Sequence, residues 1–481
     1  MKISTTVKIS AIVFLSLLAI DLQAASSTAT STNTSIWQDV LKASKENSFN
    51  VFATVIFFLA IIHAFFYGEF LYLSKHIRKT STHITNLKEV LIRFLHFLSE
   101  VEIVFALWLI PLLCGFAYCY GWNSLTEYLD DMAYNQGRFA EPIFVLVIMG
   151  ISATKPIVDF ASQIIEKLAK LGGGTVRAWW CCILFAGSLF GSIITEPAAI
   201  TICALLLGRH FFKYNPSTKF KYATLGLLLV AISIGGAMTP FAAPPVLMVK
   251  KPWDWNFVFM LTNFAWKVVI IISLSVASYS FIFRKEFVAL QKGAESSREI
   301  SSEESKSPIW LTIFHLSFLT ASILLMHNTV MILLLLLGFL AFIKITKPFQ
   351  DKFEIESPLL VCIFLASLVV HGSFQSWWIE PVLSNLDDFS IFIGSIVLTS
   401  FNDNAAITYL ATLAPNFSDT SKYMIVAGAL TGGGLTLIAN APNLAGASIL
   451  KKHFGKSISP LKLFYGALLP TIVAAILFFF L

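Results

Sequence analysis

Long apolar runs recur along almost the whole chain, and each is about 20 residues long, the length of a helix that spans a bilayer. Charged residues make up only 13% of the 481 positions, whereas soluble domains carry about 25%. The chain is therefore predicted to be an all-α, polytopic membrane protein. Its basic residues cluster in certain loops, so the net charge of +6 indicates membrane topology and not nucleic-acid binding.

A short signature occurs twice in the sequence. Each copy is an acid, one further residue and then Ala-Ala-Ile-Thr, and the copies begin at Glu196 and at Asp403. A second signature follows each copy at nearly the same spacing: Gly235-Gly236 leads to Ala243-Pro244, and Gly433-Gly434 leads to Ala441-Pro442. Two signatures in the same order indicate an internal duplication.

Residues 178–207 are predicted to form a helical hairpin rather than a single crossing. Basic residues flank the stretch on both sides, with Arg177 before it and Arg209 after it. A single crossing would place one basic flank outside, against the positive-inside rule. We therefore expect a hairpin that enters from the cytoplasm and returns there, with Thr195-Glu196-Pro197 just past its tip. Such a tip must be buried in protein or line a cavity, because lipid cannot satisfy its backbone.

The first repeat is predicted over residues 49–283, and the second over 308–481, with a charged cytoplasmic linker at 284–307 between them. Each repeat has three spans, a re-entrant hairpin, a broken helix and a final span. In the first repeat these are expected at 49–73, 101–120, 142–164, 178–207, 222–249 and 257–283. In the second they are expected at 309–326, 330–345, 358–370, 389–413, 423–450 and 461–481. The loop charges place the second hairpin on the outside, so the two repeats have opposite orientations, as in inverted-repeat transporters.

The N-terminus has the features of a targeting segment. Residues 1–24 combine Lys2 and Lys8 with a short apolar run and small residues, which predicts a signal peptide, with an uncleaved anchor as the alternative. Residues 25–48 are rich in Ser and Thr and are expected to form an exposed leader. The loop charges then place both the N-terminus and the C-terminus on the outer, periplasmic side.

The predicted site lies where the two hairpin tips and the two broken helices meet, near the middle of the membrane. Its candidate ligands are hard oxygen donors, which suit an alkali cation such as Na⁺ and not a transition metal. The two carboxylates, Asp403 and Glu196, are the expected Na⁺ ligands. The other candidates at the tips are Thr195, Ser400, Asn402 and Asn404, and those in the broken helices are Thr239, Thr436, Asn440 and Asn443.

A carboxylate at membrane depth costs a few kcal/mol in its ionised form. It therefore tends to hold a proton unless a cation pairs with it. Na⁺ and H⁺ would compete for such a group, and each would displace the other. This is the chemistry of a cation–proton exchanger, with no cofactor required.

Other roles remain open for several of these residues. Glu196 and Asp403 would each suit the N-terminus of the helix that follows. The Gly-Gly pairs would also serve as helix-packing sites. Lys155, Asp159 and Lys267 are expected to form buried ion pairs, and Lys267 is expected to face a carboxylate. Glu100 and Glu102 lie close to the cytoplasmic end of their span, and the sequence assigns them no role.

The two hairpins with polar tips, each followed by a broken helix, resemble the ion transporter superfamily. Within it the chain is most similar to bacterial Na⁺/H⁺ antiporters of the NhaD-like group, over roughly residues 50–481. Dicarboxylate symporters of this superfamily carry neutral Ser-Asn-Thr tips, whereas this chain has Thr195-Glu196-Pro197 and Asn402-Asp403-Asn404. Two carboxylates would repel a dicarboxylate and attract a cation. The resemblance implies a bacterial inner-membrane protein and a homodimer.

The leading hypothesis is a secondary transporter that exchanges Na⁺ or Li⁺ for H⁺ by alternating access. The alternative is a Na⁺- or H⁺-coupled transporter of a small organic or inorganic anion, in which Lys267 or Lys155 would meet the anion. A membrane-embedded enzyme is disfavoured, because the sequence has no recognisable metal or nucleophile constellation and no ATP-binding loop.

Overall fold

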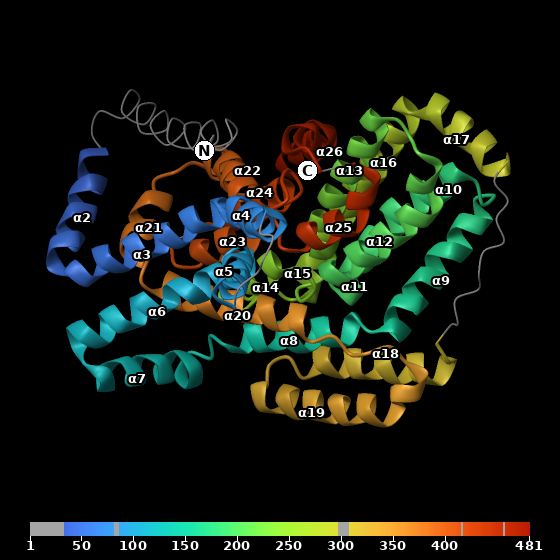
Figure 1. Ribbon diagram of the computed structural model, residues 1–481. Helices are drawn as coiled ribbons and strands as arrows, with labels where there is room; N and C mark the ends of the chain where they lie inside the picture. The colour runs from blue at the N-terminus through green and yellow to red at the C-terminus, as the bar shows by residue number, and fades with distance from the viewer. Residues whose placement is uncertain (1–32, 81–85, 297–306, 415–416, 456) are drawn as a thin grey trace.

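The computed structural model describes residues 33–80, 86–296, 307–414, 417–455 and 457–481, and all of its regular elements in these ranges are helices (Figure 1). The predicted signal peptide, residues 25–32 of the leader and most of the second half of the linker lie outside the described residues. Seven helices in the described ranges are long and apolar enough to cross a membrane, or up to nine if each bent helix pair counts as one span. The protein is thus an all-helical, multi-pass membrane protein.

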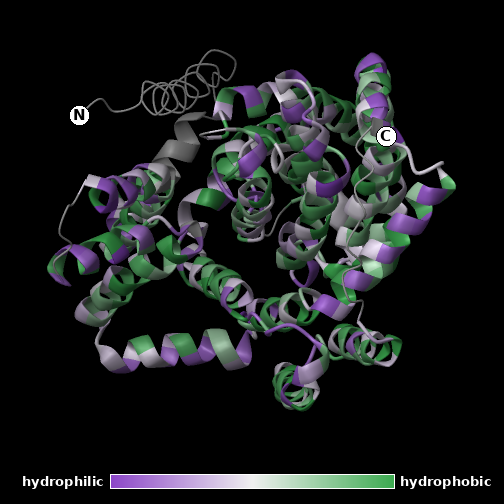
Figure 2. Cartoon of the chain, turned by 45° about the vertical axis from the view of Figure 1, so that its right-hand side comes forward, coloured by the Kyte–Doolittle hydropathy of each residue, from purple (hydrophilic) through white to green (hydrophobic). Residues whose placement is uncertain are grey.

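Hydrophobic residues cover the outside of the molecule as well as its interior (Figure 2). On one peripheral helix the exposed fraction reaches 67% for Val330, 62% for Leu337 and 79% for Ile345. Water would disfavour so large an apolar surface, whereas lipid solvates it. The outer helices are therefore suited to contact with lipid.

The first half of the chain forms sixteen of the described helices, interrupted by π-helical turns and short 3₁₀ turns. The helices are α2 (Asn33–Glu46), α3 (Ser48–Phe65), α4 (Tyr67–Thr80), α5 (Asn86–Phe97), α6 (Val101–Tyr120), α7 (Trp122–Asp130), α8 (Ala140–Ser152), α9 (Lys155–Leu171), α10 (Val176–Cys182), α11 (Ser188–Ile194), α12 (Glu196–His210), α13 (Thr218–Gly235), α14 (Pro244–Lys250), α15 (Phe257–Met260), α16 (Trp266–Ile282) and α17 (Arg284–Ser296). The turns are η1 (Asp131–Asn135), η2 (Ile183–Gly187), η3 (Phe212–Tyr214), η4 (Gly236–Met238) and η5 (Leu261–Ala265).

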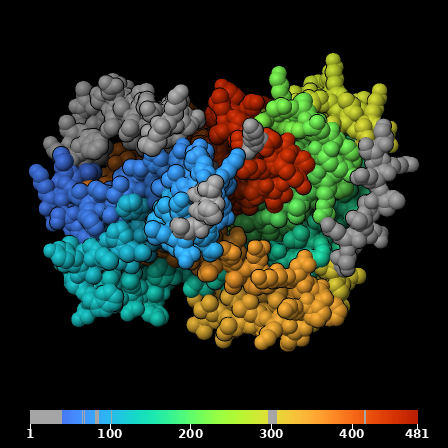
Figure 3. Space-filling model, in the orientation of Figure 1, coloured from blue at the N-terminus to red at the C-terminus, as the bar shows by residue number. Residues whose placement is uncertain are grey.

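The second half continues with nine described helices and two 3₁₀ turns. They are α18 (Ile309–Leu324), α19 (Thr329–Thr346), η6 (Lys347–Phe349), α20 (Glu356–Ser373), α21 (Ser376–Leu383), α22 (Asp388–Phe401), α23 (Asn404–Ala411), α24 (Asp419–Gly432), α25 (Pro442–Leu450), η7 (Lys451–His453) and α26 (Pro460–Phe480). On the face seen in Figure 3, α18 and α19 form a lobe beside the rest of the molecule.

The third expected span, 142–164, is bent instead of straight. It consists of α8 and α9, whose axes differ by 65° across a short break. Thr154 caps α9 with an extended backbone, and Pro156 occupies the first turn of that helix. Proline lacks the N–H that would continue the preceding helix, and its ring clashes with the carbonyl four residues earlier. Pro156 is the sequence signal of this break.

The first signature forms a helical hairpin, as its sequence predicts. One arm is made of α10, η2 and α11, the chain turns at Thr195, and α12 packs back along all three. Midway along α12, Cys203 donates a weak hydrogen bond to the Ile183 carbonyl of the other arm. The first arm also packs against α13, which is interrupted after Gly235 before α14 resumes.

The second signature has the same arrangement. Helix α22 is the first arm, Asn402 and Asp403 form the tip, and α23 is the returning arm. Helix α22 packs closely along α24, and residues 433–441 separate α24 from α25. The returning arms pack on the opposite half of the chain: α12 contacts α25, and α23 contacts α14. The hairpins and broken helices of the two halves are therefore interlocked.

The broken helices α13 and α24 cross in opposite directions. Val230 lies against Gly434, whereas Ser233, one turn later on α13, donates a hydrogen bond of 2.9 Å to the earlier Leu430 carbonyl. In each half the hairpin's first arm runs parallel to its broken helix: Ser188 meets Gly235 and Ser192 meets Met238, while Phe392 meets Gly428 and Ile396 meets Gly432. Because α13 and α24 run in opposite directions, the two first arms also run in opposite directions.

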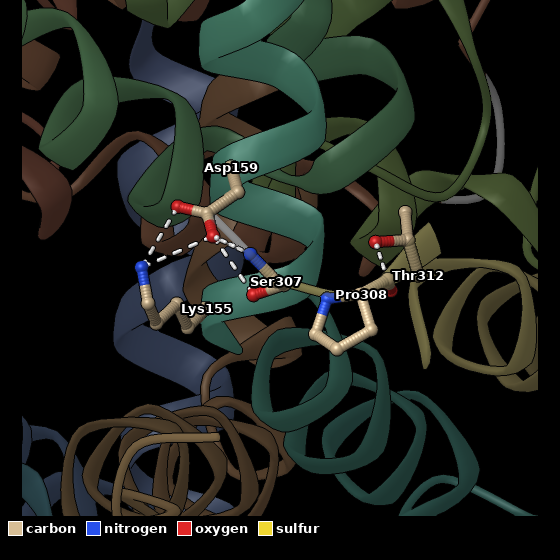
Figure 4. Close-up of polar contacts among 5 residues, drawn as sticks. All are labelled: Lys155, Asp159, Ser307, Pro308 and Thr312. Atoms are coloured by element: carbon tan, nitrogen blue, oxygen red, sulfur yellow. Dashed lines mark hydrogen bonds and ion pairs between the residues drawn. The ribbon is translucent and has the colours of Figure 1, made fainter. Parts of the chain in front are cut away.

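The Lys155–Asp159 pair lies at the junction between the two halves (Figure 4). The Lys155 ammonium is 3.0 Å from the Asp159 carboxylate, on successive turns of α9. The same carboxylate accepts hydrogen bonds from the backbone N–H and the hydroxyl of Ser307, just before α18. The pair thus fixes the start of the second half to α9.

Candidate ion-binding site

The Glu196 carboxylate is fully buried between the two halves of the chain. Its Oε2 accepts a hydrogen bond of 2.7 Å from the Asn440 side chain, which belongs to the segment between α24 and α25. Its other oxygen, Oε1, is buried without a hydrogen-bond partner among the described residues. Gly236 lies so close that a Cβ on this residue would stand 2.6 Å from Oε1. Glu196 begins α12, but the hydrogen bond that its side chain accepts among the described residues comes from Asn440 and not from the first turn of α12, so capping does not explain its position.

Thr195, immediately before Glu196, has a strained backbone. Its φ angle is +72°, in a region that a β-branched residue rarely adopts. Its hydroxyl lies 3.1 Å from that of Ser152, at the end of α8. The strained turn reverses the chain within one residue and directs the Glu196 side chain toward Asn440.

The Asp403 carboxylate is held differently, by backbone N–H groups. Oδ1 accepts from Ala405 at 2.8 Å and so caps α23, as one reading of the sequence expected. Oδ2 accepts from Ala441 at 3.1 Å, in the broken segment of the same half. Only 7% of Asp403 is exposed, yet it lines a small cavity. The Asp403 and Glu196 carboxylates are close enough to interact electrostatically.

A matching pair of hydrogen bonds ties each broken segment to its hairpin. The Thr239 hydroxyl donates to the Ser192 carbonyl at 2.8 Å, and the Thr436 hydroxyl donates to the Ser400 carbonyl at 2.7 Å. Each threonine follows a Gly-Gly pair, and each serine lies a few residues before an acid. The same contact in both halves agrees with the duplication that the signatures indicate.

Three asparagines around the tips have buried oxygen atoms without hydrogen-bond partners among the described residues: Asn404, Asn440 and Asn443. The side-chain nitrogen of Asn443 donates to the Gly433 and Thr436 carbonyls at 2.7 and 2.9 Å, so it satisfies carbonyls that the helix break frees. Leaving a buried polar atom unpaired costs about 1–3 kcal/mol. A hydrogen-bond donor or a cation at any one of these oxygens would remove the cost for that oxygen.

The remaining predicted residues hold the second hairpin in shape. The backbone N–H of Asn404, at the start of α23, donates to the Ala439 carbonyl at 3.0 Å and so ties this hairpin to the segment between α24 and α25. Asn402 accepts from the N–H of its neighbour Asp403, and the Ser400 hydroxyl donates to Ile396 one turn earlier. The side chains of Asn402 and Ser400 therefore make local hydrogen bonds that shape the tip, while the Ser400 carbonyl accepts from Thr436.

The prediction that Lys267 faces a carboxylate is wrong. Its ammonium donates to the Tyr423 hydroxyl at 2.9 Å and lies 4.2 Å from the centre of the same ring. In the described part of the chain, no carboxylate lies within ion-pair distance of it. An aromatic face and a hydroxyl hold this buried cation instead, and its spacing in the sequence could not reveal that partner.

The structure adds one acid that the sequence left without a role. Glu102, in the first turn of α6, lines the same cavity as Asp403. Ser152 contacts the tip residue Thr195, and Ser192 contacts Met238 and Thr239 in the broken segment that follows α13. Ser192 lies just before the first signature and could have been noticed there, whereas nothing in the sequence relates Glu102 or Ser152 to a hairpin far along the chain.

This arrangement suits a small, hard cation better than a transition metal. Among the described residues no group of three His, Cys, Asp or Glu side chains converges to hold a metal ion. The polar side chains at the two tips are carboxylates and amides, at breaks in membrane helices. The fold and this site define a membrane transport protein.

The chain belongs to the family described as "Putative Na+/H+ antiporter", whose family model matches residues 48–481. No curated protein matches the sequence. Among solved structures the chain is similar to the crystal structure of the YdaH transporter from Alcanivorax borkumensis, at 13% identity and a TM-score of 0.42. That match covers 79% of this chain and 96% of the other.

Proposed function

We propose that this protein exchanges Na⁺ or Li⁺ for H⁺ across the membrane, with Asp403 as the carboxylate for which the two ions compete. The family match supports cation–proton antiport. The observation that carries the proposal is the position of Asp403: a buried carboxylate, held at a hairpin tip by two backbone N–H groups, that borders a cavity. Na⁺ is the substrate in this scheme, and no cofactor takes part.

Glu196 acts as the second acid of the site. It joins the first hairpin to the broken segment of the second half through Asn440. A cation bound near Asp403 weakens the repulsion between the two carboxylates. Proton loss and cation binding would therefore affect both halves of the chain at once, which is what a coupled exchange requires.

Alternating access follows if the two halves are inverted repeats. The opposite senses of the two first arms, and the packing of each returning arm on the other half, support this arrangement. Inverted repeats place the ion site between two similar units that open to opposite sides in turn. The proposed location is the bacterial inner membrane with both termini on the periplasmic side, and the proposed assembly is a homodimer.

The alternative, anion transport, receives no support from the two lysines that it invoked. Lys155 is paired with Asp159 at the junction of the halves, and Lys267 is held by Tyr423. Neither contacts a tip residue through a described hydrogen bond. An anion at the tips would instead meet two carboxylates.

The test is a pH-gradient dequenching assay in inverted membrane vesicles. Vesicles are energised to an acid interior, and Na⁺, Li⁺, K⁺ and choline chloride are added in turn. The proposal expects dequenching by Na⁺ or Li⁺ and none by choline, without any organic substrate. If no cation dequenches above the level of vesicles that lack the protein, the proposal fails, and a screen for Na⁺-dependent anion uptake follows.

A further inference from the structure

A small cavity beside Asp403 has a second acid in its wall. It is lined by Glu102, Asp403 and the apolar side chains of Phe364, Leu437, Ile438, Ala441 and Leu444, and its volume is about 10 Å³ for a water-sized particle. That is the smallest space that holds one such particle. The two carboxylates come from helices distant in the sequence and are the charged groups of an otherwise apolar lining.

The carboxylates differ in how they are held. Asp403 receives two backbone hydrogen bonds, from Ala405 and Ala441. For Glu102 the described part of the chain offers no hydrogen bond or ion pair from another residue. A position in the first turn of α6 suits an acid because of the helix dipole. That explanation accounts for an acid at this end of the helix, but not for its place in the wall of the Asp403 cavity.

Two further acids, Glu100 and Glu356, are more exposed than Asp403. Glu356, at the start of α20, is exposed, and Glu100 is partly exposed and lies 3.7 Å from the His96 ring. Each acid interacts electrostatically with the next: Glu356 with Glu100, Glu100 with Glu102, and Glu102 with Asp403. Neighbouring groups of one sign of charge raise the local concentration of cations.

We propose that Glu102 binds the incoming cation at one side of the membrane and passes it to Asp403. The inference rests on the proposed function and identifies where the cation enters the proposed site. Glu102 lies at the end of α6 that follows the basic segment 75–93, which loop charge places in the cytoplasm. Glu102 therefore binds cations that enter from the cytoplasm, and a cation that enters from the opposite side of the membrane does not meet Glu102.

The test compares Na⁺ kinetics from the two faces, in inverted and in right-side-out vesicles. For Glu102→Gln, loss of one nearby charge is expected to raise the KM for Na⁺ about five- to tenfold at the cytoplasmic face and less than about twofold at the other, with the maximal rate little changed. Glu102→Asp restores part of the affinity. Glu127→Gln, which neutralises an exposed acid on α7, serves as the matched control and leaves both constants unchanged.

Equal KM changes at both faces would indicate a general structural effect and overturn the inference, as would no change at either face. A second readout needs no transport: the Na⁺ concentration that gives half-maximal thermal stabilisation of the purified protein. It rises in Glu102→Gln if Glu102 binds the cation. If the wild type shows no exchange but is stabilised by Na⁺ in this Glu102-dependent way, the proposed function fails and the site assignment stands. If Na⁺ stabilises neither protein and drives no exchange, both the proposed function and the role of Glu102 fail.

Discussion

The two hairpin tips carry the same signature but hold their acids in different ways. At the first tip, Glu196 is fully buried, receives one hydrogen bond from the Asn440 side chain and keeps one oxygen unpaired among the described residues. At the second tip, Asp403 receives two backbone hydrogen bonds and borders a cavity. One acid is thus bound to the other half of the chain, and the other is held within its own half with one side open.

This difference indicates a division of labour within the proposed mechanism. Backbone donors are fixed by the helices that carry them, so Asp403 keeps its position whether it binds a proton or a cation. Glu196 depends on a side chain from the opposite half, so a change in its charge alters the contact between the halves. On this account Asp403 binds the transported ion, and Glu196 couples that event to the rest of the protein.

The largest expected effect is that of Asp403→Asn. The substitution removes the charge but keeps a side chain that caps helices well, so the protein should still fold. We expect the rate of Na⁺-dependent dequenching to fall at least about 100-fold, with an unchanged elution profile in size-exclusion chromatography. Retention of wild-type exchange with the same pH dependence would show that another group binds the ion.

Glu196→Gln and Asn440→Ala probe the contact between the halves. Each substitution is expected to lower the exchange rate about tenfold, because each removes the charge-assisted hydrogen bond between these two residues. Since both changes break one interaction, the double variant should lose little more than either single variant. Rates measured in the same vesicle assay would refute the coupling if the two losses simply multiplied.

Gly236→Ala tests whether the Glu196 carboxylate must keep its position. The added Cβ would stand 2.6 Å from Glu196 Oε1 and 3.0 Å from the Ala243 Cβ, so the carboxylate must move. We expect a several-fold loss of exchange, smaller than for Asp403→Asn. Gly394→Ala, on the arm α22, meets no atom within 4 Å and is the matched control. Equal activity in the two variants would mean that the position of this carboxylate is unimportant.

The smallest expected effect concerns the start of the first arm in each hairpin, at the end opposite the tip. Asp387 caps α22 and Thr175 caps α10, so replacing either by Ala should cost about 1 kcal/mol of stability. The Ser390 hydroxyl, together with backbone N–H groups, lowers the pKa of Asp387 below 3.8. The ionised cap therefore stabilises the fold fully above that pH and loses its effect as the pH falls through the lowered pKa.

Thermal unfolding in detergent at a series of pH values measures this difference. The gap between wild type and Asp387→Ala should shrink on acidification below pH 3.8, whereas the gap for Thr175→Ala should stay constant. A pH-independent gap for Asp387→Ala would show that charge contributes nothing at this cap.

The repeated signature made the two helix breaks predictable. In both places an acid, one further residue and Ala-Ala-Ile-Thr mark the start of a helix. The structure confirms the breaks at Thr195 and at Asn402–Asp403. The loss of regular helix after Gly235 and after Gly432 was likewise predictable from the glycines and prolines. These features are local, so a single sequence reveals them.

Long-range partners were not predictable in the same way. Lys267 was expected to face an acid because a buried charge needs a partner, but a tyrosine on α24 meets that need. The place of Glu102 beside Asp403 depends on how α6 packs against the second half, and no periodicity in α6 encodes that contact. The bend between α8 and α9 was not predicted, although Pro156 and the polar residues around it marked the break.

Proton release on Na⁺ binding to the purified protein tests the central claim most directly, because it requires no membrane and no gradient. The protein is placed in a weakly buffered detergent solution with a pH indicator, and NaCl, LiCl or choline chloride is added at constant ionic strength. Competition at Asp403 predicts that Na⁺ or Li⁺ releases protons from the wild type and none from Asp403→Asn. Equal release from the two proteins would contradict the claim that Asp403 is the group at which the ions exchange.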